Sequence, residues 1–362
     1  MSFFIRIAYL VVFMAGISLV LSAGVVLFNT LAIRRQAKAI KNRSMLRQGL
    51  MGYINGDIGA RELKTAVSGR ESLLVGLVAQ LSDELGEPSH TKLIEVFELS
   101  GLQSLVRKEL DMLARSRNWR KRQRAATMLP YIVGRQVVIP PLLHALEDRV
   151  MMVRFSAAHS LAAIKAVDAV VPILEHLLLP DEWPIERTIE IMREMGSEAV
   201  PALLSYLGQP DAKDACKVFA ISALGLQRAG EAVPVILSHL SHPDKEIRIQ
   251  CAKALGNIGA SEALPDLVTA LGDNAWEVRA AVARSLRAVQ DERAINALVG
   301  TLGDPVWWVR YNSADSLAEL GSSGITALKY ALTHQDRFAR DVSRLVLQER
   351  NILKSSQSTA VS

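Results

Sequence analysis

Reactive side chains and catalytic motifs are scarce in this sequence. It contains two cysteines in 362 residues, Cys216 and Cys251, and they lack the C-x-x-C spacing typical of redox and zinc sites. Phosphate-binding, dinucleotide-binding, serine-hydrolase and zinc-protease motifs are also absent. We therefore expect both cysteines to be small buried residues. We also expect a protein that is not an enzyme and that binds no metal, cofactor or small-molecule substrate.

Charged residues are absent from residue 7 to residue 33, a stretch rich in Leu, Val, Ile, Phe and Ala. A membrane-spanning helix needs roughly 20 apolar residues, whereas the apolar region of a secretory signal has about 7–15. The length of the run favours an uncleaved anchor over a signal peptide. We predict one transmembrane helix within an amino-terminal anchor of residues 1–34.

Basic residues follow this run immediately, and no acid occurs before Asp57. Because positive residues remain on the cytoplasmic side, the rest of the chain is predicted to lie in the cytoplasm, held to the inner (cytoplasmic) membrane by a single pass. Basic segments beside a span are attracted to anionic lipid headgroups by roughly 1 kcal/mol per residue. The cations expected to contact headgroups are Arg34, Arg35, Lys38, Lys41 and Arg43.

Acidic residues are absent from residue 112 to residue 146, where basic residues gather around Trp119. This segment is the best candidate for a recognition surface, and an acidic protein, a phosphate or lipid headgroups would complement its charge. A solvated helix face is the alternative. Nucleic acid is not expected, because no basic motif interleaved with aromatic residues is present. The candidate partner-binding residues are Arg115, Arg117, Arg120, Lys121, Arg122 and Arg124.

A basic residue recurs at steps of 30–32 over more than 200 residues, in similar local sequence. A fixed period of this size is typical of a solenoid, in which each unit completes its core with its neighbours. A small residue often stands four positions after this slot and a leucine seven positions after it, which places all three on one stripe of a helix. The slot residues are Arg122, Arg154, Lys217, Arg248, Arg279 and Arg310, with Ile185 in a divergent copy and Arg340 in a shortened last one.

Each unit is predicted to contain two helices. Glycine after the first helix (Gly225, Gly256 and Gly259) suits a helix end, and a proline often opens the second helix, where its missing N–H has no cost. A turn with an aspartate closes the unit. We expect the slot arginine to pair with the turn aspartate of an adjacent unit rather than to bind a ligand. The turn aspartates are Asp148, Asp181, Asp211, Asp244, Asp273, Asp304 and Asp336.

Three tryptophans stand at the starts of consecutive first helices. Trp276 and Trp307 occupy equivalent places in the repeat, and Trp308 follows directly. Two adjacent helical positions cannot both face one seam. We expect Trp276 and Trp307 to pack between units. Trp308 is a candidate contact for a partner, because tryptophan is enriched among the residues that dominate interfaces.

The phrase x-V-R-x-x-A-A-x-x-L-G-x-I-G, clearest at residues 247–259, and the P-x-L-x-x-x-L phrase after it resemble the short HEAT repeat of the phycobilisome-lyase type. The resemblance implies an all-α protein built as an α-solenoid, a HEAT-type superhelix, joined to the amino-terminal transmembrane helix. We predict a helical juxtamembrane region and cap in residues 35–114. About seven repeats follow in 115–350, with a disordered tail in 351–362.

The chain is similar to bacterial membrane-anchored HEAT-repeat proteins. This resemblance implies a scaffold or adaptor that holds a membrane-associated protein partner at the cytoplasmic face of the membrane. A HEAT-repeat enzyme or enzyme subunit, lyase-like or metal-dependent and hydroxylase-like, is the alternative. The iron-dependent hydroxylases of this fold carry repeated His-Glu pairs, and none of the seven histidines here is followed by glutamate.

Overall fold

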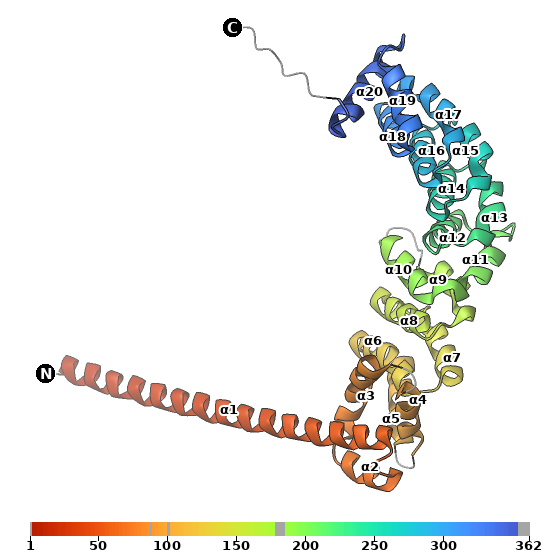
Figure 1. The fold of residues 1–362 in the computed structure, drawn as a ribbon. Coiled ribbons are helices and arrows are strands. Elements are labelled where there is room, and N and C mark those ends of the chain that lie inside the picture. The colour runs from red at the N-terminus through yellow and green to blue at the C-terminus, as the bar shows by residue number, and fades with distance from the viewer. Residues whose placement is uncertain (1, 87–88, 100–101, 178–184, 354–362) are drawn as a thin grey trace. The chain divides into compact units, whose positions relative to one another are not determined.

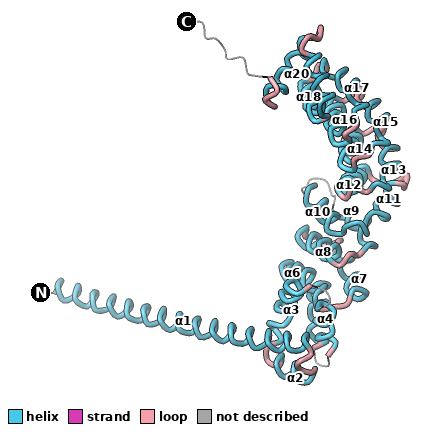
Figure 2. Tube along the Cα trace, in the orientation of Figure 1, coloured by secondary structure: helices cyan, strands magenta, loops and turns pink. Residues whose placement is uncertain are grey.

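The computed structural model describes residues 2–86, 89–99, 102–177 and 185–353. Side chains are not described at residues 2–13, 15–20, 23, 72, 177 and 185–187. In the described ranges every regular element is a helix, as predicted (Figures 1 and 2). The chain forms two compact units, Met1–Val138 and Ile139–Ser362.

The first unit is built on the carboxyl end of a long helix. Leu46, Leu50 and Ile54 lie four residues apart on α1 and are buried, so one stripe of α1 forms the core with the helices that follow. A 3-10 turn, Leu129–Tyr131, ends the last full helix of the unit. The helices are α1 (Ser2–Asn55), α2 (Ala60–Val67), α3 (Glu71–Leu85), α4 (Ser89–Glu98), α5 (Gln103–Arg115) and α6 (Trp119–Met128).

The amino-terminal part of α1 is exposed. From residue 24 to residue 40 every side chain is exposed, and Leu46 is the first α1 side chain that the rest of the unit buries. Among the described residues, no helix has an apolar stretch of the length needed to cross a membrane. The predicted span begins at residue 7. From residue 7 to residue 20, the structure describes the side chain of Met14 and no other.

The second unit is a succession of helix pairs. Its first helices α12, α14, α16 and α18 form one row, and the shorter helices α13, α15 and α17 form the other (Figure 1). Helix α7 (Arg135–Ala145) crosses the boundary between the units. The remaining helices are α8 (Met151–Ala163), α9 (Val170–Leu177), α10 (Ile185–Met195), α11 (Val200–Leu207), α12 (Asp214–Leu226), α13 (Val233–Ser238), α14 (Lys245–Ile258), α15 (Leu264–Ala270), α16 (Trp276–Val289), α17 (Ile295–Gly300), α18 (Trp307–Glu319), α19 (Gly321–Ala331) and α20 (Arg337–Glu349).

The predicted stripe of small residues and leucines forms the core of the repeats. On α14, Ala252 and Leu255 are fully buried, and the equivalent residues of α16 and α18 are buried as well. Three second helices, α11, α13 and α15, begin with a short 3-10 turn and carry proline at their first or second position. The proline therefore stands where it breaks no hydrogen bond of the helix.

Two glycines expected at helix ends have another role. Gly259 has φ +78° and ends α14 in the left-handed conformation, as predicted. Gly225 and Gly256 instead lie inside α12 and α14, where an added Cβ atom would stand 2.6 Å from Cα of Ala254 and 2.8 Å from Cβ of Ser285. Their helix-end prediction is wrong. They lack a side chain because adjacent first helices approach closely at these points.

Gly225→Val should lower the melting temperature of the full chain in detergent by several degrees. The added side chain meets backbone of α14, and overpacking of this kind typically destabilises by about 1–3 kcal/mol. Gly76→Val is the matched control, because Gly76 is an exposed glycine inside α3 with no atom within 4 Å of the added Cβ. Thermal unfolding followed by circular dichroism reads both variants. Equal effects would contradict the packing role of Gly225.

Candidate partner-binding surface

The slot arginines share one contact. In each, Nη1 donates to the backbone oxygen of the residue six positions earlier, so the guanidinium holds the turn in front of its own helix. The pairs are Arg122 with Ser116 (2.7 Å), Arg154 with Asp148 (3.0 Å), Arg248 with His242 (2.7 Å), Arg279 with Asp273 (2.8 Å), Arg310 with Asp304 (2.7 Å) and Arg340 with His334 (2.7 Å). This contact is intrinsic to one unit and was not predicted.

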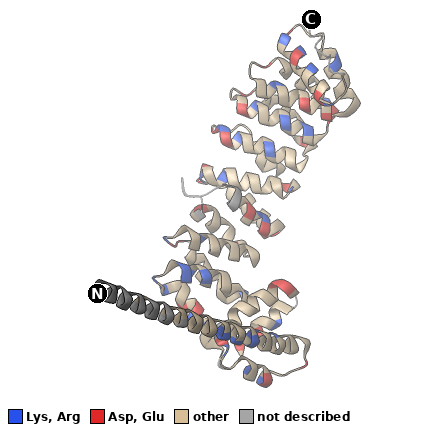
Figure 3. Ribbon diagram, turned by 90° about the vertical axis from the view of Figure 1, so that its left-hand side faces the viewer, with Lys and Arg blue, Asp and Glu red and all other residues tan. Residues whose placement is uncertain are grey.

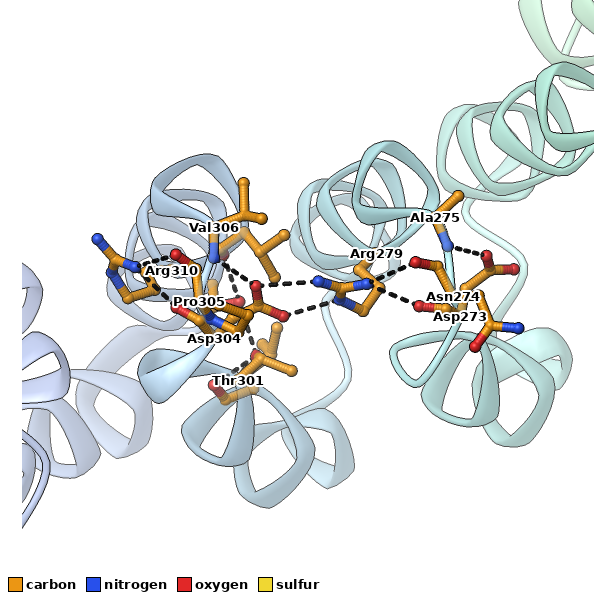
Figure 4. A network of polar contacts seen from close by, with 12 residues as sticks. Asp273, Asn274, Ala275, Arg279, Thr301, Asp304, Pro305, Val306 and Arg310 are labelled. Atoms are coloured by element: carbon orange, nitrogen blue, oxygen red, sulfur yellow. Dashed lines mark hydrogen bonds and ion pairs between the residues drawn. The ribbon is translucent and has the colours of Figure 1, made fainter.

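The predicted pairing with an adjacent unit is present at Arg248 and Arg279. Arg248 donates through Nε and Nη2 to Asp273 at 2.7 and 3.0 Å. Arg279 donates in the same way to Asp304 at 2.7 and 3.1 Å, and Figure 4 shows this second pair. Burial alone would raise the pKa of Asp273, but hydrogen bonds from Arg248 and from the N–H of Ala275 outweigh burial and hold this pKa below its usual value. Each guanidinium therefore joins two consecutive units.

We call these two consecutive arginine–aspartate pairs the ladder. Histidine replaces aspartate in the turn before the ladder and in the turn after it. His242 and His334 accept a hydrogen bond from the N–H two residues later, as Asp273 and Asp304 do. The aspartates predicted for these turns, Asp244 and Asp336, are instead the N-caps of α14 and α20. Their assignment to the ladder was wrong, because the sequence offers an aspartate two residues after the structural position.

The slot residues of the units that precede these two histidine turns have other partners. Lys217 pairs with Asp214 of its own helix at 2.9 Å, and Arg310 lies over the ring of Phe338 at 4.4 Å. Arg122, Arg154 and Arg310 are buried. The slot residues are thus held by turns, carboxylates and an aromatic ring of the solenoid itself.

The basic segment around Trp119 separates into one buried and five exposed cations. Arg122 is 6% exposed and holds its turn, so it is not available to a partner. Arg115, Arg117, Arg120, Lys121 and Arg124 are exposed, and Arg120 lies 5.1 Å from the ring centre of Trp119. The buried position follows from the repeat, because Arg122 is the slot residue of its unit.

A groove of about 690 Å³ lies between α5 and α6, and we call it the α5–α6 groove. It brings two of the predicted residues, Arg115 and Lys121, together with two cations of α5 that the sequence analysis did not select, Arg107 and Lys108. These two precede the acid-free segment, and Asp111 separates them from it in sequence. Helical spacing explains the grouping, since positions 104, 108, 111 and 115 share one face. The main lining residues are Arg107, Lys108, Asp111, Arg115, Ser116 and Lys121.

Three tryptophans at the starts of α16 and α18 are exposed or partly exposed. Trp276, Trp307 and Trp308 are 39%, 43% and 55% exposed. Trp307 contacts Trp308 edge to face with ring centres 4.8 Å apart, and it stacks on Tyr311 at 4.9 Å. Both Trp276 and Trp307 keep a large exposed area, and the ring partners of Trp307 lie on its own helix, so their packing between units stays a prediction.

Lys and Arg residues lie along the part of α1 that follows the apolar run (Figure 3), and helical spacing divides them between two faces of the helix. Arg34, Arg35, Lys38 and Lys41 are exposed, and three of them fall within about 60° of the helix circumference. Arg43 lies on the opposite side and donates to Gln80 of α3, while Arg47 pairs with Glu84 at 2.7 Å. Arg43, predicted to contact lipid, is thus engaged in the packing of α1 on α3.

Both cysteines lie on first helices of the second unit, Cys216 on α12 and Cys251 on α14. Cys216 and Cys251 are free and buried, and burial raises the pKa of both thiols. Among the residues that the structure describes, no group of three His, Cys, Asp or Glu side chains is placed to hold a metal ion.

A family model for HEAT repeats matches residues 107–193, 200–287 and 266–348, which is well over half of the chain. The protein belongs to the HEAT-repeat family. The match begins within α5, at residue 107, so the repeat region of this HEAT-repeat protein includes most of the residues that line the α5–α6 groove. No curated protein matches the chain.

Solved structures similar to this HEAT-repeat protein have diverse roles. The CpcE–CpcF complex of phycocyanin lyase from Nostoc sp. PCC7120 is 23% identical over 59% of this chain and 96% of that chain, with a TM-score of 0.35. Human deoxyhypusine hydroxylase is 17% identical over 87% and 99%, with a TM-score of 0.29. Importin β is 14% identical over 84% and 47%, with a TM-score of 0.39. At these values the similarities carry no functional argument.

Proposed function

We propose that this HEAT-repeat protein is a membrane-anchored scaffold, without enzymatic activity, that holds a protein partner at the cytoplasmic face of the membrane. Tethering would restrict the solenoid to the membrane surface and raise its effective concentration toward partners in the same membrane. Repeat proteins of this kind present extended surfaces that suit protein binding.

The observation that carries the proposal is the exposed apolar surface of α1. Val25, Val26, Leu27 and Phe28 are 58–72% exposed, and four consecutive residues point to nearly all sides of a helix. A helix that is apolar all round is typical of a buried or membrane-embedded segment, and contiguous apolar surface of this kind is rare on soluble monomers. The charge-free run from residue 7 to residue 33 extends this surface in sequence.

The basic stripe after the run supports the cytoplasmic orientation. Arg34, Lys38 and Lys41 are exposed on one face of α1, directly after the last apolar residue of the run. Anionic headgroups attract cations at this depth, and positive residues beside a span favour the cytoplasmic side. We include contact between these residues and anionic lipid headgroups in the proposal.

Reporter fusions after Ser362 test the orientation. We expect a green fluorescent protein fusion to fluoresce and an alkaline phosphatase fusion, which is active only in the periplasm, to be inactive. Replacing Arg34, Arg35, Lys38 and Lys41 by glutamine should raise the phosphatase activity, because it removes the topology signal and keeps the cations that pack on α3. An active phosphatase on the native chain would overturn the cytoplasmic placement.

A further inference from the structure

We propose that the α5–α6 groove binds an acidic segment of a protein partner that inserts one apolar side chain beside its carboxylates. The proposal rests on the scaffold function and gives the scaffold a defined partner chemistry and a defined surface.

Charge is the first support. Four cations line the groove, Arg107, Lys108, Arg115 and Lys121, against one acid, Asp111. All four are exposed, and none of them forms an ion pair within the described ranges. By contrast, Arg287 of α16 faces Asp315 of α18 at 2.9 Å. The groove therefore concentrates positive charge that the protein itself leaves unbalanced.

An apolar pocket adjoins the groove. It measures about 330 Å³ and shares Gln103 and Arg107 with the groove, so the two cavities have a common edge. Val137 on its rim is 57% exposed although it is apolar. A free phosphate would leave this pocket empty, whereas a peptide side chain would fill it. The apolar lining includes Ile94, Phe97, Val106, Leu110, Ile132 and Val137.

The spacing of the cations fits an extended chain better than a compact anion. Arg107 and Arg115 lie two helical turns apart, about 12 Å along the axis of α5. The whole helix is about 20 Å long, which equals about six residues of extended peptide. A single phosphate binds best where donors converge on one point. Successive carboxylates of a peptide can meet these cations in turn.

The distance from the membrane favours a protein over lipid. Leu46 is the first buried side chain of α1, about 20 Å along the helix from the end of the charge-free run. Helix α5 packs on α4, and α4 packs on α1. Attraction to headgroups decays over a Debye length of about 8 Å at physiological salt. In a membrane-anchored protein, the exposed part of α1 between the charge-free run and Leu46 would therefore hold the packed helices of the first unit beyond this range. A partner protein, unlike a lipid headgroup, can extend from the membrane surface to the groove.

Peptide binding to the full chain in nanodiscs of neutral phosphatidylcholine tests the proposal. The probe is a fluorescent peptide of about eight glutamates with one central leucine, and its partner probe has serine in place of leucine. We expect Arg107→Glu, Lys108→Glu, Arg115→Glu and Lys121→Glu together to weaken binding of the leucine peptide at least about tenfold. We expect the serine peptide to bind the native chain about tenfold more weakly than the leucine peptide.

Two control chains separate the groove from general charge and from folding. Arg61→Glu, Arg149→Glu, Arg228→Glu and Lys329→Glu change the net charge equally at exposed sites outside the groove, and binding should stay within about twofold. Val137→Asn should reduce the preference for leucine while binding of the serine peptide stays nearly unchanged, because asparagine makes the rim of the pocket polar and adds no charge beside the groove. Because Val137 is exposed, its substitution should not disturb folding. It therefore still tests the role of the apolar pocket if the fourfold variant misfolds. Circular dichroism compares the helicity of all chains.

Several outcomes would overturn the proposal. No binding of the leucine peptide, or equal loss in the control chain, would exclude the groove. Displacement of the peptide by inorganic phosphate, but not by chloride of equal ionic strength, would assign the groove to a phosphorylated ligand. Displacement by phosphatidylserine vesicles, but not by phosphatidylcholine vesicles, would assign it to lipid. None of these results changes the outcome of the reporter fusions. The proposal of a membrane anchor and the proposal of a peptide-binding groove can therefore be refuted independently.

Discussion

Leu21→Arg together with Val25→Arg should release the protein from the membrane. Both residues lie near the middle of the charge-free run, and an arginine at the centre of a span costs about 2.5–3.5 kcal/mol on insertion scales. Two such residues cost about 5–7 kcal/mol, which is similar to the insertion energy of the whole run, where each Leu, Ile, Phe or Val contributes about 0.3–0.6 kcal/mol. The measurement is the share of the protein that stays with membranes after carbonate extraction.

The matched control is Leu21→Ile with Val25→Ile, which keeps the apolar character and should leave the protein in the membrane fraction. Both native side chains are exposed on α1, at 64% and 58%, so neither pair of substitutions touches the packed body of the first unit. Carbonate-resistant association of the double arginine variant would contradict a spanning helix and point to attachment through another surface.

The repeat array was predictable because its period is visible residue by residue. The slot residue, the small residue and the leucine recur at helical spacing. In a solenoid, residues at equivalent positions of each repeat make equivalent contacts. The errors concern contacts between units. Gly225 and Gly256 resemble helix ends in sequence, but the close approach of the next helix decides their role. Asp244 and Asp336 have the expected residue type and lie two positions from the ladder.

The candidate surface was predictable only in part. The sequence places Arg115 and Lys121 in one acid-free segment, but Arg107 and Lys108 join them only because α5 and α6 fold against each other. The same limit applies to α1, where the run of cations is continuous in sequence and divides between an exposed face and a face that packs on α3. Linear clustering predicts how much charge a region carries, and helix direction decides where the charge points.

Arg279→Ala should destabilise the solenoid by about 3 kcal/mol. The guanidinium donates to Asp304 through two hydrogen bonds and to the turn at Asp273 and Asn274 through Nη1. Its loss leaves the Asp304 side chain, which is 8% exposed, without its cation. Removing one partner of a buried pair typically costs about 3–5 kcal/mol, and we expect the lower end because water can reach the edge of this pair. Denaturant unfolding of the full chain in detergent measures the loss.

A double-mutant cycle separates the ion pair from the turn contact. Asp304→Asn removes the charge and keeps an oxygen for the N–H of Val306, which Asp304 accepts at 2.8 Å. Combined with Arg279→Ala, it should cost about 1–3 kcal/mol less than the sum of the single changes, because the second substitution removes a carboxylate already left unpaired. Arg284→Ala, on the exposed side of the same helix, should stay within about 0.5 kcal/mol. Additive losses at Arg279 and Asp304 would mean that the turn contact alone accounts for the recurrence of arginine, and that the link between units is incidental to stability.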